Sequence, residues 1–181
     1  LALLRCISSS PASAVSALNE RLNGVPATDA EQAITSELTG DEGDDEIAAD
    51  RETPALADAG EESVLRGLMA KAQSLYGPQN DPKLKALIAG LKPLIQDGFS
   101  PIVFCQFIST ANYVGQYLRK AFKTCHVQVV TGNLAPSERE EAVAALTADP
   151  RRILVATNCL SEGINLQKGF NAVVHYDLAW N

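Results

Sequence analysis

The chain has 181 residues and a formal net charge of −7, and 46% of its residues are hydrophobic. This length fits one domain of ordinary size with additional elements. No apolar run approaches the roughly 18 residues of a membrane-spanning helix and no signal peptide is recognisable, so we expect a cytoplasmic protein with no membrane contact.

The negative charge is concentrated in one segment. Residues 29–62 hold 13 of the 22 acidic residues and one basic residue, Arg51, which gives a local charge of −12. Residues 81–181 hold 10 basic and 8 acidic residues, a charge of +2. The overall acidity therefore does not exclude nucleic acid as a partner of the C-terminal part of the chain.

The first 98 residues divide into three parts by composition. Residues 1–26 space Leu, Ala and Val as a helix does, and Ser10-Pro11 is typical of a helix start. Residues 27–62 contain few large apolar side chains whose burial would offset the entropy lost on ordering. We therefore expect a helical segment over 1–26, a disordered acidic linker over 27–62 and a helical lead-in over 63–98.

Two helices are predicted near the end of this region, over residues 61–75 and 83–95. The second begins after Asp81-Pro82, which places an acidic N-cap before a proline in the first turn. Its apolar side is formed by Leu84, Leu87, Ile88, Leu91 and Ile95.

From residue 99 onward, short apolar runs alternate with helical patterns. The predicted strands are 102–107, 127–130, 153–156 and 172–176, and the predicted helices are 110–122, capped by Ser109, and 136–148. Strands separated by helices of this length pair in parallel through right-handed crossovers. Residues 99–181 are therefore predicted to form an α/β domain around a parallel sheet.

Polar residues stand at the ends of three of these strands. They are Gln106 and Ser109 near the first, Thr131 and Gly132 after the second, and Thr157 and Asn158 after the third, with Glu162, Gly163, Asn165 and Gln167 further along that last loop. Open parallel sheets bind ligands at the edge where their strands end. Hydroxyls and backbone N–H groups near helix N-termini suit phosphates. The same residue types also cap and turn ordinary loops, and taken alone the pattern leaves both interpretations open.

Four segments resemble motifs of superfamily 2 helicases and translocases. The most specific is motif V, matched by Thr157-Asn158 with Ser161-Glu162-Gly163-Ile164-Asn165-Leu166-Gln167, although the family often has Asp at position 158. Residues 101–110 resemble motif IV, Thr131-Gly132 with Glu138-Arg139 resembles the stretch between motifs IV and V, and residues 172–181 resemble the strand before motif VI. Arg139 fits a helix surface equally well. With the helices that precede them, these segments are similar to the C-terminal lobe of Swi/Snf-type ATPases.

The resemblance implies a RecA-like second lobe of an ATP-dependent DNA helicase or translocase. Its nucleotide, ATP with Mg, would be bound mainly by an N-terminal RecA-like lobe of the same polypeptide, and its partner would be double-stranded DNA. Nucleotide binding and coupling would fall to Glu162, Gly163, Asn165 and Gln167, and nucleic-acid contacts to Gln106, Ser109, Thr131, Gly132, Thr157 and Asn158.

No catalytic residue is expected within the chain. It contains no Gly-Lys-Ser/Thr phosphate-binding loop, and the arginine-bearing motif VI of the family would follow residue 181. We therefore expect a fragment that neither hydrolyses ATP nor holds a cofactor or a metal by itself. The four cysteines form no Cys-x-x-Cys pair and are expected to be reduced thiols.

Two other interpretations remain. A degenerate RecA-like lobe could serve as a protein-binding module that hydrolyses nothing. A Rossmann-type enzyme acting on a small molecule is disfavoured, because no Gly-rich turn follows the first predicted strand.

Overall fold

The computed structural model describes residues 2–23, 59–160 and 164–177. Its elements, in chain order, are α1 (Ala2–Ser9), α2 (Pro11–Asn23), α4 (Ala59–Ser74), α5 (Pro82–Gln96), β1 (Pro101–Phe104), α6 (Ile108–Ala121), β2 (His126–Val130), α7 (Pro136–Thr147), β3 (Arg152–Ala156), the short 3₁₀ helices η2 (Asn158–Leu160) and η3 (Leu166–Lys168), and β4 (Ala172–His175). None of the helices in these ranges is long and apolar enough to cross a membrane.

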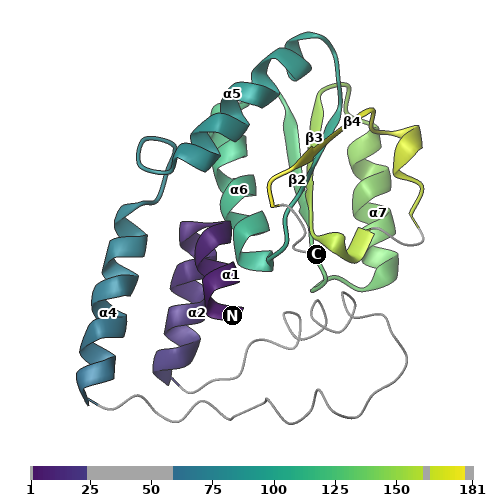
Figure 1. Cartoon of the computed structure of the whole chain (residues 1–181). Helices are drawn as coiled ribbons and strands as arrows, with labels where there is room; N and C mark the ends of the chain where they lie inside the picture. The colour runs from purple at the N-terminus through teal and green to yellow at the C-terminus, as the bar shows by residue number, and fades with distance from the viewer. Residues whose placement is uncertain (1, 24–58, 161–163, 178–181) are drawn as a thin grey trace.

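The four strands form one parallel sheet in the order β2-β3-β1-β4 (Figure 1). β3 lies inside the sheet, where Val155 is opposite Val129 of β2 and Val103 of β1. Strands buried on both faces read as continuous apolar runs, and Ile153 to Ala156 is such a run. The predicted α/β architecture with a parallel sheet is thus confirmed.

Helices cover both faces of the sheet and divide the core in two. Successive residues of a strand point to opposite faces, so Val103 packs with α5 and α6, whereas Ile102 packs with α7. On the first face the helices contribute Leu84, Leu87, Leu91, Val114 and Leu118; on the second face α7 contributes Val143 and Leu146. The sheet is therefore held rigidly, and its loops emerge from a fixed frame.

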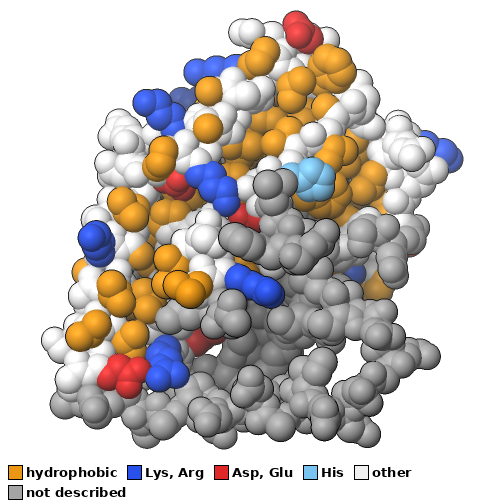
Figure 2. All heavy atoms as spheres, viewed as in Figure 1, with side chains coloured by type: hydrophobic (Ala, Val, Ile, Leu, Met, Phe, Trp, Pro, Cys, Tyr) orange, Lys and Arg blue, Asp and Glu red, His pale blue; other side chains and the backbone are white. Residues whose placement is uncertain are grey.

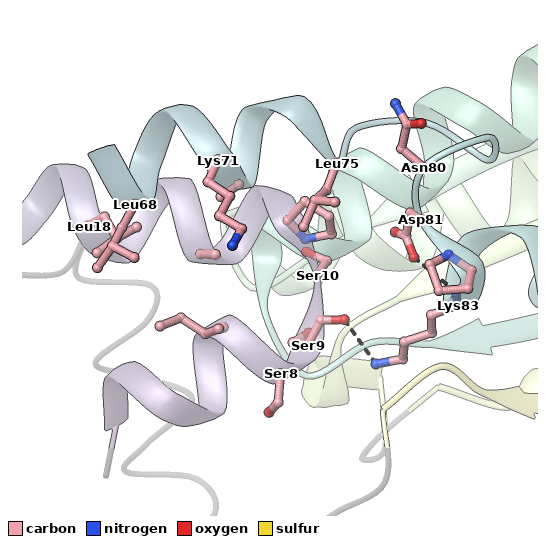
Figure 3. A pocket seen from close by; sticks show the side chains of 15 residues that line it. Ser8, Ser9, Ser10, Leu18, Leu68, Lys71, Leu75, Asn80, Asp81 and Lys83 are labelled. Carbon is pink, nitrogen blue, oxygen red and sulfur yellow. Dashed lines mark hydrogen bonds between the residues drawn. The ribbon is translucent and has the colours of Figure 1, made fainter. Parts of the chain in front are cut away.

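The N-terminal helices form a separate layer beside this frame. α2 contacts α1, α4 and α6, which attaches the layer to the sheet domain (Figure 1). An apolar groove of about 360 Å³ lies between these helices and includes Leu18, Leu68 and Leu75 in its lining (Figure 3). α4 begins at Ala59, so the last residues assigned to the acidic linker are helical, which corrects that boundary. The remainder of the predicted linker, residues 27–58, lies outside the described residues.

β4 is an edge strand of the sheet. It pairs with β1, and no described strand pairs with its other side. Its residues alternate between half-buried and exposed, and Val173 is 58% exposed. Hydrophobic side chains reach the surface beside β4 and over α4 (Figure 2).

The two predicted helix caps had different outcomes. Asp81 caps α5, because its carboxylate accepts the N–H groups of Lys83 and Leu84 at 2.9 and 3.1 Å. Ser109 does not cap α6, which begins at Ile108 after Phe107. The Ser109 hydroxyl is buried in the first turn of α6 and has no hydrogen-bond partner among the described residues.

Gly115 should be the least replaceable glycine of the α6–β2 contact. A Cβ atom added there would collide with Cγ2 of Val129 on β2. We expect Gly115→Ala to lower the free energy of unfolding by about 1–3 kcal/mol, the usual range for overpacking. Gly90 of α5 has open space around the same position, so Gly90→Ala should raise stability by about 0.5–1 kcal/mol through helix propensity. Urea unfolding of both variants measures this, and equal effects would contradict the predicted close contact.

Candidate functional site

The loops after all four strands begin at the same edge of the sheet. Backbone hydrogen bonds continue past the strands there: Cys105 N–H donates to Ala156 O at 2.8 Å, Thr157 N–H to Val130 O at 3.3 Å, and Tyr176 N–H to Phe104 O at 2.9 Å. This edge is the place where open parallel sheets bind ligands. The structure thus brings the strand-end residues that the sequence singled out to one side of the molecule.

The two threonines at this edge face inward. Thr157 has no exposed surface, and its hydroxyl lies 3.3 Å from Sγ of Cys159. Thr131 is 7% exposed. The Thr157 side chain is thus not presented to solvent in this structure, and its contact with nucleic acid, which the resemblance implied, stays a prediction. Asn158, the next residue, is partly exposed and opens η2.

Arg139 ties the loop after β2 to the loop after β3. Its guanidinium donates to the carbonyl oxygens of Leu134 at 2.8 Å, Gly132 at 3.1 Å and Cys159 at 3.4 Å. Arg139 is thus more than a helix-surface residue, and its role is to position backbone. The sequence contained one indication of this role. Arg139 lies in the first turn of the predicted helix after the loop, from which a long side chain can reach the loop carbonyl groups. Gly132 itself has open space where a Cβ would stand, so its backbone is accessible.

A buried carboxylate joins the ends of β1 and β4 to α1 and α5. Asp177, whose side chain is 6% exposed, accepts hydrogen bonds from Gln106 N–H at 3.0 Å, the Ser9 hydroxyl at 2.9 Å and the Lys83 ammonium at 2.6 Å. Lys83 also donates to Ser9 O at 2.9 Å (Figure 3) and lies 4.3 Å from the ring centroid of Tyr176. This cluster was not predicted, because the residues that donate to Asp177 lie 71 to 168 positions before it in the chain.

Gln106 lies in the loop after β1, and its backbone N–H donates to Asp177 and not to a neighbouring strand. β1 ends at Phe104 and not at residue 107 as predicted, and Gln106 is partly exposed beside the end of the strand. Ser109, the other predicted contact near β1, has a buried hydroxyl, and its contact with nucleic acid stays a prediction.

The motif V segment presents its polar residues to solvent where it is described. Asn165 and Gln167 are exposed on either side of Leu166, which is partly buried and packs against the α7 side of the core. Glu162 and Gly163 lie outside the described residues. η3 lies toward the edge where the strands begin, because Arg152 at the start of β3 donates to the carbonyl oxygen of Gly169, the residue after η3.

Burial dominates the titration of the groups near the site. It raises the pKa of the Cys105 thiol well above its usual value, which makes this cysteine an unreactive core residue. It also raises the pKa of Tyr113 and of Tyr176, because the phenolate would lose its hydration. The Tyr113 hydroxyl donates to Asp81 at 3.0 Å and accepts from Gly77 N–H at 3.1 Å, whereas the Tyr176 hydroxyl has no partner among the described residues.

The two tyrosines should therefore respond oppositely to replacement by phenylalanine. At pH 7, Tyr113→Phe should cost about 1–3 kcal/mol because it leaves Asp81 and Gly77 N–H unsatisfied, whereas Tyr176→Phe should be neutral or stabilising. An unfolded tyrosine ionises near pH 10, and the folded protein keeps these protons longer, so stability falls as pH rises above about 10. Tyr176→Phe should reduce that alkaline loss. Urea unfolding at pH 7 and pH 10.5 tests both statements; an alkaline loss equal to that of the unmodified protein would refute the second.

The fold and its loop-bearing edge define a class: a RecA-like α/β lobe built on a parallel sheet. Residues 82–181, more than half of the chain, match the model of the helicase conserved C-terminal domain, and the chain belongs to this family.

Individual relatives agree with this assignment. An ATP-dependent RNA helicase, ROK1, of Meyerozyma guilliermondii is 29% identical over 94 residues, which are 50% of this chain and 17% of that protein. The C-terminal domain of the SWI2/SNF2 ATPase of Sulfolobus solfataricus superposes with a TM-score of 0.50 at 17% identity, over 94% of this chain and 66% of that one. The core of the same ATPase in complex with dsDNA superposes with a TM-score of 0.50 at 15% identity, over 96% and 32%. The chain thus shares the fold of the SWI2/SNF2 lobe and spans a minor part of the helicase it matches.

Proposed function

We propose that the chain is the C-terminal lobe of an ATP-dependent DNA helicase or translocase of the Swi/Snf-like branch of superfamily 2. The observation that carries the proposal is the match of residues 82–181 to the helicase conserved C-terminal domain, on a parallel sheet whose strand-end loops begin at one edge. In this role the lobe would face an N-terminal RecA-like lobe of the same polypeptide and work in the cytoplasm.

ATP with Mg fits the lobe as one half of a shared site. The exposed amides of Asn165 and Gln167 offer polar contacts, but the chain carries no phosphate-binding loop. Bound ATP would supply the hydrolysable phosphoanhydride. The residues of this lobe would orient the nucleotide, and the Arg139 contacts would keep the loops after β2 and β3 in register.

Double-stranded DNA is the partner we favour over RNA. The solved relative that covers most of this chain and carries nucleic acid holds dsDNA, whereas the sequence relative is named an RNA helicase. Contacts from backbone N–H groups and side-chain amides to phosphates are blind to base sequence, as movement along a strand requires.

ATP hydrolysis by the full-length polypeptide tests the proposal. We expect stimulation by double-stranded DNA that exceeds stimulation by RNA of equal length, and no turnover by residues 1–181 alone. Stimulation by RNA only would transfer the proposal to RNA. A full-length polypeptide that hydrolyses nothing with either nucleic acid would favour the protein-binding module.

A further inference from the structure

A polar pocket of about 220 Å³ lies where the end of α1, the start of α5 and the loops after β1 and β4 meet. Arg5, Ser9, Lys83, Gln106 and Asp177 are among its lining residues. Two of these, Arg5 and Ser9, come from α1, which lies outside the part of the chain that matches the helicase family.

The hydrogen bonds within the pocket leave donors free and the acidic acceptor occupied. Asp177 already accepts three hydrogen bonds, from Gln106 N–H, Ser9 and Lys83. The Ser8 hydroxyl donates to Arg5 O at 2.9 Å, so its proton is in use. Lys83 uses two of its three N–H groups, on Asp177 and on Ser9 O. The third is left for the Tyr176 ring, whose centroid lies 4.3 Å from the ammonium, or for a ligand.

Two further donors are unused. The Arg5 side chain is exposed and forms no ion pair with any described carboxylate, and the Gln106 carboxamide forms no hydrogen bond to another described residue. Lys83 and Asp177 cancel in charge, so Arg5 gives the pocket a net positive charge. A site with free N–H donors, one uncompensated guanidinium and a saturated carboxylate selects an anionic acceptor.

We propose that this pocket binds a phosphodiester group of the nucleic-acid backbone, with Arg5 as the main contact and Lys83 and Gln106 as additional donors. The inference rests on the proposed function and extends it, since α1 would add a phosphate contact to those of the sheet edge. A guanidinium holds a phosphate through two parallel N–H groups, and such contacts fix position without reading sequence. A phosphodiester is favoured over a peptide carboxylate because the pocket opens beside Gln106, at the edge that carries the other candidate contacts.

The salt dependence of DNA binding tests the proposal. Binding of a fluorescein-labelled 20-bp duplex would be measured at several KCl concentrations for the protein, for Arg5→Gln and for Arg66→Gln. Arg66 is a matched control, because it is exposed on α4 and pairs with Glu62 away from the pocket. Loss of one phosphate contact reduces the slope of log K against log salt by about 0.9 and weakens binding about fivefold at 0.1 M salt. We expect both changes for Arg5→Gln, neither for Arg66→Gln, and an intact slope for Arg5→Lys.

Inorganic phosphate is the second probe. Its effect on the Gln106 side-chain and Arg5 Nε signals in ¹H–¹⁵N spectra should be competed by the duplex. An unchanged slope in Arg5→Gln overturns the proposal. If the protein bound no duplex but phosphate still shifted these signals in an Arg5-dependent way, the proposed function would be contradicted. The pocket would then be a site for free anions only. If the duplex bound equally well to the protein and to Arg5→Gln, the proposed function would be unaffected, but the pocket would not be a phosphate contact.

Discussion

Replacement of Asp177 by alanine should lower the free energy of unfolding by about 3 kcal/mol. The carboxylate is 6% exposed and is the common acceptor of Gln106 N–H, Ser9 and Lys83, so its removal strands buried donors from three separate elements. Lys83 is 39% exposed and recovers part of its loss by hydration, which keeps the effect below that of breaking a fully buried pair. For a protein stable by about 5–15 kcal/mol, this is a large fraction.

Urea unfolding would measure the Asp177 effect as a lower midpoint with an unchanged slope. Asp97→Ala is the matched control, because Asp97 is exposed after α5 and its substitution should stay within about 0.5 kcal/mol. Asp177→Asn keeps the size of the side chain but offers an N–H group to existing donors, and its cost should be intermediate. If Asp177→Ala and Asp97→Ala unfolded at the same midpoint, the carboxylate would not join these elements in solution.

Gly163→Val should lower nucleic-acid-stimulated ATP hydrolysis by the full-length polypeptide at least tenfold, which corresponds to about 1.4 kcal/mol in the barrier. The expectation follows from the motif V resemblance, in which a nucleotide approaches the glycine backbone, and a side chain there would block the approach. Glu162→Ala should give a loss of similar size through coupling. Because the resemblance gives Glu162 a role in coupling and not in folding, thermal unfolding of Glu162→Ala should change stability by no more than about 0.5 kcal/mol.

The contrast between activity and stability is what makes the motif V test decisive. A loop that only turns the chain would lose stability when Gly163 is replaced, while activity per folded molecule stayed intact. Measuring both quantities on the same preparations separates the two roles. Folded variants with unchanged hydrolysis and unchanged DNA binding would remove the motif V assignment.

Local sequence patterns predicted the sheet and most helix boundaries, because the forces that set them act between near neighbours. The Asp81-Pro82 pair is an example: cap and helix are adjacent, and the carboxylate bonds only two and three residues away. Ser109 has the right chemistry for a cap as well, but α6 begins one residue before it. Which of several polar residues in a loop becomes the cap depends on the packing of the following helix, which a single sequence does not encode locally.

The parts of the site that sequence reasoning missed are those built from distant segments. The sequence identifies Asp177 only as the residue that follows a predicted strand. No residue near it in the chain indicates that Ser9 and Lys83 are its hydrogen-bond partners. Thr157 was expected to face a ligand because it follows a strand, yet the loop turns its side chain into the protein. Residue type and place at the strand ends could be predicted, but side-chain direction and long-range pairing could not.

The exposed outer side of β4 has a practical consequence for handling the protein. None of the described strands pairs with this side, so β4 offers N–H and C=O groups to another strand, and Val173 adds an exposed apolar side chain. Natural sheets protect such edges with lysine, proline or a bulge, and Ala172-Val173-Val174-His175 has none of these. Concentrated samples should therefore form strand-to-strand aggregates. A lysine at position 173 is the substitution that would keep them in solution.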